Sequence, residues 1–285
     1  MNFYLGVIVI TALHAAMGVG AEVHQRRTGT LCLAHGALAG TAAYIYAILG
    51  VEYLAAPFAA LLAVCISTGM GALLALPARR LGPLQYALIT FAVQALWSAT
   101  VLTWRGLTGG ALGIAGVPPL VRSSLISSLH LHVALSCILV IVAVRLLRWS
   151  ERHPLSTAFA ALTRSEELAS AIGIPARTLR LFAGSLHGAI VGAAGVLFAS
   201  YLSFIDPTIF STDLSVIVLA CSLVGRPRAV WGPLVGSFVL VAVPDLLRLV
   251  GLNASAAAHM RLTLGGAFLT LIATRSHLFA QAEHP

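Results

Sequence analysis

The sequence predicts an all-α protein, a single polytopic bundle of about nine transmembrane helices over residues 1–285. Hydrophobic residues make up 59% of the chain and the mean hydropathy is +0.96, whereas ordinary globular domains are roughly half apolar. Several apolar runs reach about 20 residues, enough to cross a hydrocarbon core of about 30 Å. Only 9% of the residues are charged, and the basic ones lie at the ends of the apolar runs.

The predicted spans cover residues 3–21, 31–49, 57–76, 84–103, 125–147, 178–201, 214–224, 231–250 and 259–274. The first begins too soon after the start and lacks the basic region of a cleavable signal, so we expect it to be retained. The second is rich in Gly and Ala and ends before Glu52, and the third is closed by Pro77, Arg79 and Arg80.

The connections between the later spans have different characters. Residues 104–122 are rich in Gly and Pro, which favours a loop. Residues 203–213 form a polar connection without arginine, and the run 214–224 is too short to cross alone. Pro244 and Asp245 are expected to break the eighth span.

The arginines predict the orientation, because cytoplasmic loops carry an excess of basic residues. With the loop around residue 165 inside, the N-terminus lies outside and the C-terminus inside. The inner arginines are then Arg26, Arg27, Arg79, Arg80, Arg145, Arg148, Arg152, Arg164, Arg177, Arg180, Arg226, Arg228 and Arg275. The outer ones are only Arg105, Arg122, Arg248 and Arg261.

A polar island, residues 158–173, lies within the long cytoplasmic loop at about 150–177. It holds Arg164, Glu166 and Glu167 within four positions. The residues from Glu167 onward, Ala169 among them, predict a short amphipathic helix that Gly173 ends. A helix in such a loop is expected to contact a partner, and the alternative is a solvated loop helix.

The absence of lysine from the sequence excludes several functions. All 17 basic residues are arginine, so the chain can hold neither a P-loop nor a lysine Schiff base. If ATP drives the protein, another chain binds it. The basic residues at span ends do not indicate nucleic acid, and no cofactor is predicted on this chain. The cysteines Cys32, Cys65, Cys137 and Cys221 all lie in apolar segments and predict buried free thiols, without a disulfide or metal site.

Glycines recur every four residues in the sixth span. Gly184, Gly188 and Gly192 would lie on one helix face and let another backbone approach closely. The pattern fits a packing seam in a translocation bundle or with a partner chain, or ordinary packing within this chain. Gly232 and Gly236 repeat the spacing in the eighth span.

The candidate pathway residues are Thr30, directly before the second span, and His35, Gly36 and Gly40 within it. Ionisable residues within membrane spans are costly and default to functional candidates, and broken backbone at that depth is tolerated beside a water-filled path. The alternative is a hydrogen-bonded His35 near the cytoplasmic interface. His187 is interpreted as a bundle histidine with satisfied hydrogen bonds. Ser185 lies two positions before it and does not face it on a helix, so no catalytic residue is predicted.

Four stretches of the chain resemble the inner-membrane permeases of ABC importers for branched-chain amino acids, of the LivM type. They are GTLCLAHGALAGTAAY from Gly29, LPARRLGPLQYALITFAVQ from Leu76 with LTGGALGIAGVP from Leu107, TRSEELASAIGI from Thr163, and SFIDPTIFSTDLSV from Ser203 with WGPLVG from Trp231. Each is weak alone, whereas their order and spacing are specific. The chain departs from the family at VGRPRAVWGP, where Arg226, Pro227 and Arg228 replace small residues, and at Thr30 and Cys32.

The resemblance implies a permease in a bacterial inner membrane, with residues Arg164 to Gly173 as the coupling loop. It also implies a second, LivH-like permease, cytoplasmic ATPase subunits that bind ATP and Mg, and an extracytoplasmic substrate-binding protein. The expected substrate is a branched-chain amino acid, or urea or a short amide. The alternative from another class is a stand-alone secondary transporter, which would need acidic or histidine residues deep in the spans.

Overall fold

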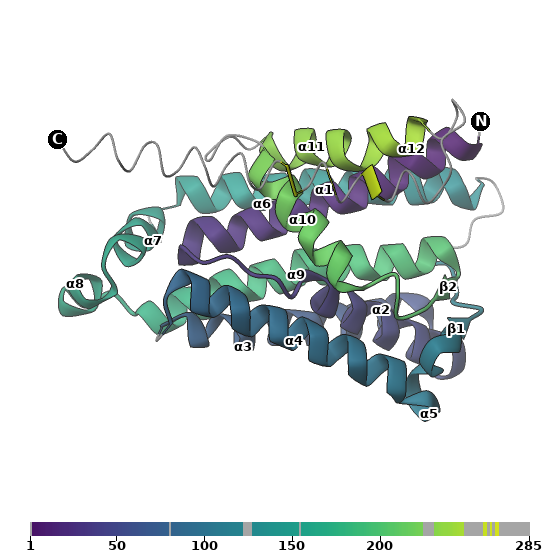
Figure 1. The fold of residues 1–285 in the computed structure, drawn as a ribbon, viewed down its shortest axis with the longest axis horizontal. Coiled ribbons are helices and arrows are strands. Elements are labelled where there is room, and N and C mark those ends of the chain that lie inside the picture. Colours follow the sequence, from purple (N-terminus) through teal and green to yellow (C-terminus); the bar gives the residue numbers. More distant parts are fainter. Residues whose placement is uncertain are drawn as a thin grey trace.

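The computed structural model describes residues 2–79, 81–121, 127–153, 155–224 and 231–247, together with five residues between 259 and 267. These residues form an all-α bundle of roughly antiparallel helices (Figure 1). Five described helices are long and apolar enough to cross a membrane: α1 (Asn2–Thr28), α3 (Ala56–Ala75), α4 (Pro83–Thr103), α6 (Ser128–Arg152) and α9 (Ala176–Leu202). The number nine and the orientation of the termini stay predictions.

The other described helical elements are α2, which packs along α3 and α9 inside the bundle, and shorter pieces around it. They are α2 (His35–Glu52), η1 (Pro77–Arg79), α5 (Arg105–Thr108), η2 (Gly110–Leu112), α7 (Leu155–Arg164), α8 (Glu166–Ala171), α10 (Thr212–Val224), α11 (Gly232–Ser237), the π-helical turn η3 (Phe238–Ala242) and α12 (Val243–Leu247). Helix α9 is central, because it packs against α1, α2, α3 and α6. Helices α4 and α6 lie further out and expose large apolar side chains.

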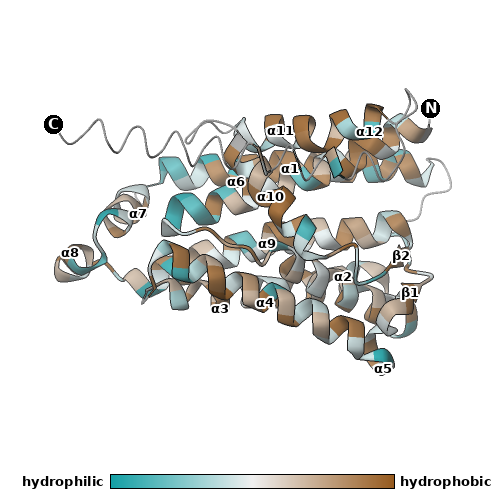
Figure 2. Ribbon diagram, in the orientation of Figure 1, coloured by the Kyte–Doolittle hydropathy of each residue, from teal (hydrophilic) through white to brown (hydrophobic). Residues whose placement is uncertain are grey.

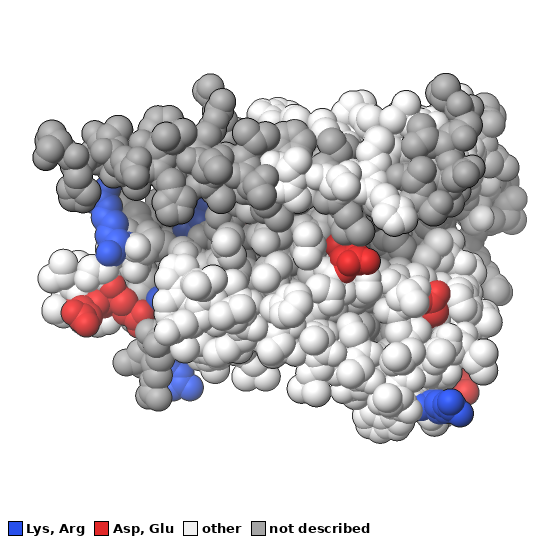
Figure 3. Space-filling view, viewed as in Figure 1, with Lys and Arg blue, Asp and Glu red and all other residues white. Residues whose placement is uncertain are grey.

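Charged and polar residues gather at the ends of the bundle, and apolar residues cover its length (Figure 2). Figure 3 shows basic and acidic side chains together at the α7–α8 end and a smaller charged group at the α5 end, with acidic side chains also between them. The basic residues seen on this face lie toward the two ends, as expected for a bundle that spans a bilayer, because charged groups in hydrocarbon carry a large cost. The cysteines differ from expectation in part: Cys32 and Cys221 are buried, whereas Cys65 and Cys137 are exposed on the outside of the bundle.

Two predicted helix boundaries are wrong. Helix α1 continues seven residues past residue 21, to Thr28, because Arg26 forms ion pairs with Glu22 one turn earlier and with Glu151 of α6. The second span is helical only from His35, and residues 30–34 are non-helical. The predicted break at Pro244 is also wrong, because the helix passes through it after the π-helical turn η3. Most of the predicted ninth span lies outside the described residues.

The loop predicted at residues 104–122 is confirmed as a connection, with two short helical turns and a strand. Strand β1 (Ile114–Ala115) pairs antiparallel with β2 (Phe204–Ile205), a pairing that the sequence did not predict. Gly113, with φ of +68°, lies so near this pairing that an added Cβ would meet the Ile205 carbonyl oxygen at 2.1 Å. Only glycine fits there.

Small residues bring α3 and α9 into backbone contact. Gly184, Gly188 and Gly192 of α9 all face α3, and the buried residues of α3 recur every four positions: Ala59, Ala63, Ser67, Gly71 and Ala75. The Ser67 hydroxyl donates to the Gly188 carbonyl at 2.9 Å and to the Leu38 carbonyl of α2 at 3.1 Å. The glycine face predicted from the sequence therefore lies against a helix of the same chain.

We expect Gly188→Ala to destabilise the bundle, because the new Cβ would lie 2.3 Å from the Ser67 carbonyl oxygen. Overpacking of this kind costs about 1–3 kcal/mol. Thermal unfolding in detergent would measure it. The matched control is Gly69→Ala on α3, where nothing lies within 4 Å. Equal stability of the two variants would contradict the close approach.

Candidate functional site

The chain crosses the interior of the bundle as a non-helical segment before α2 begins. Residues 30–34 have no regular secondary structure and are mostly buried, so their backbone groups need partners from elsewhere. The Thr30 N–H donates to the Thr28 hydroxyl at 3.3 Å, and the Leu33 N–H donates to the Thr90 hydroxyl of α4 at 3.0 Å. Side chains therefore replace the missing helical hydrogen bonds.

The start of α2 is also buried, and two polar side chains accept its first N–H groups. The Gly36 N–H donates to the Ser215 hydroxyl of α10 at 2.8 Å, and the Ala37 N–H donates to Gln94 Oε1 at 2.6 Å. The residue at the N-cap position, Ala34, forms no side-chain cap. Capping from other helices takes the place of the Ser, Thr, Asp or Asn that would usually cap a helix locally.

Gln94 joins four segments of the chain. While its carbonyl accepts from Ala37 and from the Ser215 hydroxyl at 3.1 Å, its Nε2 donates to the Phe210 carbonyl at 3.0 Å. The side chain is fully buried. It therefore holds α2, α4, α10 and the connection before α10 in one hydrogen-bonded junction, to which we refer below as the Gln94 junction.

The predicted pathway residues are all buried, and His35, Gly36 and Gly40 lie at or near this junction. Thr30 belongs to the non-helical segment before α2, where it contacts Thr28 and His24, and His35 is the first residue of α2. An added Cβ on Gly36 would meet the Phe210 carbonyl at 2.6 Å, and one on Gly40 would meet the Trp97 ring at 2.2 Å. The two glycines are thus needed for close packing around the junction. Whether these residues line a solute path stays a prediction.

Thr90 and Gln94 were not among the predicted site residues, although the sequence of α4 has a pattern that indicates them. Its buried residues include Tyr86, Thr90 and Gln94 at a spacing of four, which places a polar stripe on one face of an apolar helix. In a membrane helix a polar stripe faces the protein interior.

One expectation about a histidine is wrong: Nε2 of His187 has no hydrogen-bond partner, whereas His187 was expected to be satisfied. Neither ring nitrogen of His35 has a hydrogen-bond partner, which goes against the alternative of a hydrogen-bonded His35. The two rings contact each other, with centroids 5.1 Å apart. His24 of α1 contacts His187 at the same centroid distance.

The short helix predicted in the polar island is confirmed as α8. The Ser165 hydroxyl caps it by accepting from the Leu168 N–H at 3.3 Å. At the other end Gly173 has φ of +85°, and the Ile174 N–H donates to the Ala169 carbonyl at 3.0 Å, as in a Schellman motif. Helix α7, which precedes α8, was not predicted.

Side chains of α8 divide into an anchoring set and an outward set. Glu166 accepts from Arg180 of α9 at 2.7 Å, and Ala169 is buried. Leu168 and Ile172 are 71% and 75% exposed, one helical turn apart on the outer face. Arg164 and Glu167 are also exposed.

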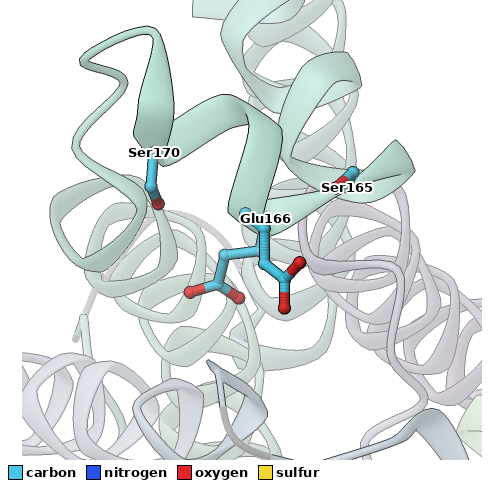
Figure 4. Close-up of a pocket in the computed structure, with 4 residues that line it drawn as sticks. Ser165, Glu166 and Ser170 are labelled. Atoms are coloured by element: carbon cyan, nitrogen blue, oxygen red, sulfur yellow. The ribbon is translucent and has the colours of Figure 1, made fainter.

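A shallow pocket of about 500 Å³ lies on the same segment and is lined by Ser165, Glu166, Glu167 and Ser170. Figure 4 shows the labelled side chains of Ser165, Glu166 and Ser170 around it. The exposed surface of this segment therefore has two parts, the apolar pair Leu168 and Ile172 and the acidic pocket beside it, which Leu168 and Ile172 do not line. An exposed apolar pair rimmed by charge is typical of a protein interaction surface.

The helix before α8 is tied to α1. The Arg27 guanidinium lies over the Phe159 ring of α7 at 5.1 Å and donates to the Ser150 hydroxyl of α6 at 2.7 Å. Phe159 and Leu162 of α7 also pack on Ala176, Leu179 and Ala183 of α9. The segment α7–α8 is thus attached to both α1 and α9.

Apolar helices around a buried polar junction, with an exposed helix pair between two long spans, define a multi-pass membrane protein of the transport class. The chain belongs to the family described as branched-chain amino acid transport system / permease component, whose model matches residues 3–273. This confirms the family resemblance of the four sequence stretches.

Two relatives have names that agree with the family. The chain is 25% identical over 272 residues to the high-affinity branched-chain amino acid transport system permease protein LivM of Escherichia coli (strain K12). It is 25% identical over 268 residues to the protein of the same name from Salmonella typhimurium. Each match covers 85% of this chain and 63% of the relative, so the chain spans less than two thirds of their length. No solved structure matches the chain.

We expect Gln94→Leu to destabilise the protein, because the Ala37 N–H and the Phe210 carbonyl would lose their side-chain partner. Each buried polar group left unsatisfied costs about 1–3 kcal/mol. Unfolding in detergent would measure the loss. Thr100→Ala on the exposed face of α4 removes only a bond to its own helix and is the control. A Gln94→Leu variant as stable as this control would rule out the Gln94 junction as a stabilising element.

Proposed function

We propose that the chain is the membrane-spanning permease subunit of an ABC importer that moves a branched-chain amino acid into the cell. Separate cytoplasmic subunits would bind ATP and Mg and hydrolyse ATP. A second, LivH-like permease would complete the membrane part, and an extracytoplasmic binding protein would deliver the substrate. The membrane would be the bacterial inner membrane, with α7 and α8 on its cytoplasmic side. Urea or a short amide is the competing substrate class.

The observation that carries this proposal is the outward face of α8. Leu168 and Ile172 are large, apolar and exposed at the charged end of the bundle, where aqueous solvent and not lipid would meet them. A groove on an ATPase subunit would bury them, and Arg164 and Glu167 would add polar contacts at its rim. The Glu166–Arg180 ion pair would transmit the movement of α8 to α9.

The Glu166–Arg180 ion pair gives Glu166 and Glu167 different proposed roles. Glu166 faces Arg180 within the chain, so reversing its charge would disturb the attachment of α8 to α9. Glu167 faces outward and can contact a partner without such an effect. The coupling contacts are therefore assigned to Arg164, Glu167, Leu168 and Ile172, while Glu166, Ala169 and Gly173 hold α8 in place.

A second candidate function, a stand-alone secondary transporter, is favoured by one observation. Three buried histidines, His24, His35 and His187, lie together inside the bundle, and ion-coupled carriers place titratable groups at such depth. Uptake by this chain alone in proteoliposomes, driven by a proton gradient, would support the carrier.

We expect the double variant Leu168→Asp, Ile172→Asp to release the ATPase subunits and to lower ATP-driven uptake at least tenfold. Truncating a buried interface anchor costs about 2 kcal/mol or more, and a tenfold change corresponds to about 1.4 kcal/mol. The measurements are co-purification in mild detergent and uptake of labelled leucine and urea.

Ala160→Asp, on the exposed face of α7, is the matched control and should retain both the ATPase and uptake. If the double variant keeps the ATPase subunits and normal uptake, α8 is not the coupling helix. Recovery of the native chain alone under gentle conditions would favour the carrier.

A further inference from the structure

Three histidines from three helices form a buried cluster beside the non-helical segment before α2. His24 of α1 and His35 of α2 each lie against His187 of α9, with ring centroids 5.1 Å apart in both pairs. Tyr86 of α4 stacks on His24 with centroids 5.6 Å apart and rings inclined by 16°. None of these side chains is more than 1% exposed. We refer to His24, His35 and His187 as the histidine cluster.

The cluster contains polar atoms without partners. These are Nδ1 of His24, both ring nitrogens of His35, and Nε2 of His187. Buried polar groups are normally hydrogen-bonded, so a group of four unpaired nitrogens in one place requires an explanation. In membrane proteins, intramembrane ionisable groups that lack internal partners mark solute and ion pathways.

Arg180 also has nitrogen atoms without hydrogen-bond partners, and it lies between the histidine cluster and α8. It is seven residues before His187 on α9, two turns along the same face, and is 6% exposed. One of its terminal nitrogens donates to Glu166, whereas Nε and Nη1 have no partner. Arg180 and the histidine cluster, which lie between α8 and the Gln94 junction, therefore together hold several nitrogen atoms without hydrogen-bond partners.

The chemistry of these groups selects the kind of ligand. A neutral imidazole offers one N–H donor and one acceptor, and a guanidinium offers donors only. A ligand with both an ammonium and a carboxylate group satisfies this combination, because its ammonium donates to imidazole nitrogens and its carboxylate accepts from Arg180. Among the described residues, no three His, Cys, Asp or Glu side chains are arranged to hold a metal ion.

We propose that the histidine cluster is a gate in the solute path, where the zwitterionic head group of an α-amino acid is hydrogen-bonded as it passes. This inference rests on the proposed function as an amino acid permease. In the present conformation the rings contact one another and close the path. A change in the angle between α1 and α9 would separate His24 from His187, open the path and offer the unpaired nitrogens to the solute. The non-helical backbone at residues 30–34 adjoins this point, since the Thr30 hydroxyl lies 3.4 Å from His24 Nε2, as expected beside a polar path.

The test uses the full importer in proteoliposomes, with the four native cysteines replaced by alanine. His35→Cys and His187→Cys are each exposed to a membrane-impermeant methanethiosulfonate reagent, in the resting state and after trapping with ATP and vanadate. We expect modification at least tenfold faster in one state than in the other, and protection by leucine. His14→Cys is the control, because His14 is buried on α1 beside Phe198, away from the cluster.

A second measurement separates passage from folding. We expect His187→Leu to raise the KM for leucine uptake at least tenfold, and His187→Gln, which keeps a donor and an acceptor, to raise it less than threefold. A purely structural histidine would change the amount of folded protein and the maximal rate without this difference in KM.

The inference is overturned if neither introduced cysteine is modified in any state while the cysteine-free parent transports, or if both His187 variants have the native KM. Failure of the proposed function has a different signature, since the cysteine-free parent would then take up no branched-chain amino acid although its ATPase subunits are bound. State-dependent modification that urea prevents and leucine does not would also overturn the assignment to an amino acid head group.

Discussion

The fold depends on satisfying a stretch of non-helical backbone inside an apolar bundle. A helix satisfies its own backbone hydrogen bonds, but the non-helical residues before α2 and the first turn of α2 cannot. Thr90, Gln94 and Ser215 accept three of these N–H groups. Without them the segment would have to become helical or move to water. Helix α4 is therefore polar on its inner face and apolar outside, and its position is set by the backbone that it serves.

The Gln94 junction and the α3–α9 contact both fix the position of α2. Helix α2 is held at its start by Gln94 and along its length by α3 and α9, where Ser67 donates to the Leu38 carbonyl and Gly195 approaches the Ala39 carbonyl. Both contacts require small or specific polar residues, so neither tolerates much variation. The outer faces of α4 and α6 have no such requirement, because any large apolar side chain suits a lipid-facing surface.

Sequence patterns predicted the parts that depend on local chemistry. The apolar runs gave the long helices, and the Gly173 stop gave the end of α8. The start of α2 could not be predicted, because residues 31–34 are apolar and could extend a helix, and the residues that hold them in a non-helical conformation lie on other helices. The histidine cluster was equally hidden. Its members are 11 and 152 positions apart in the sequence, and each alone resembles an isolated bundle histidine. The small residues of α3 also recur at a spacing of four in the sequence, but the prediction of a helix contact did not include them.

The attachments of α7 and α8 determine which helices a pull on α8 would move. Helix α8 is bound to α9 through Glu166 and Arg180, and α7 is bound to α1 through Phe159 and Arg27. Moving α7 and α8 alone would separate both pairs and expose Phe159, so the segment is expected to move together with the ends of α1 and α9. Those two helices carry His24 and His187. A displacement that changes the angle between α1 and α9 would therefore change the contact between these two rings. No separate signalling element is needed to connect the surface of α8 with the interior of the bundle.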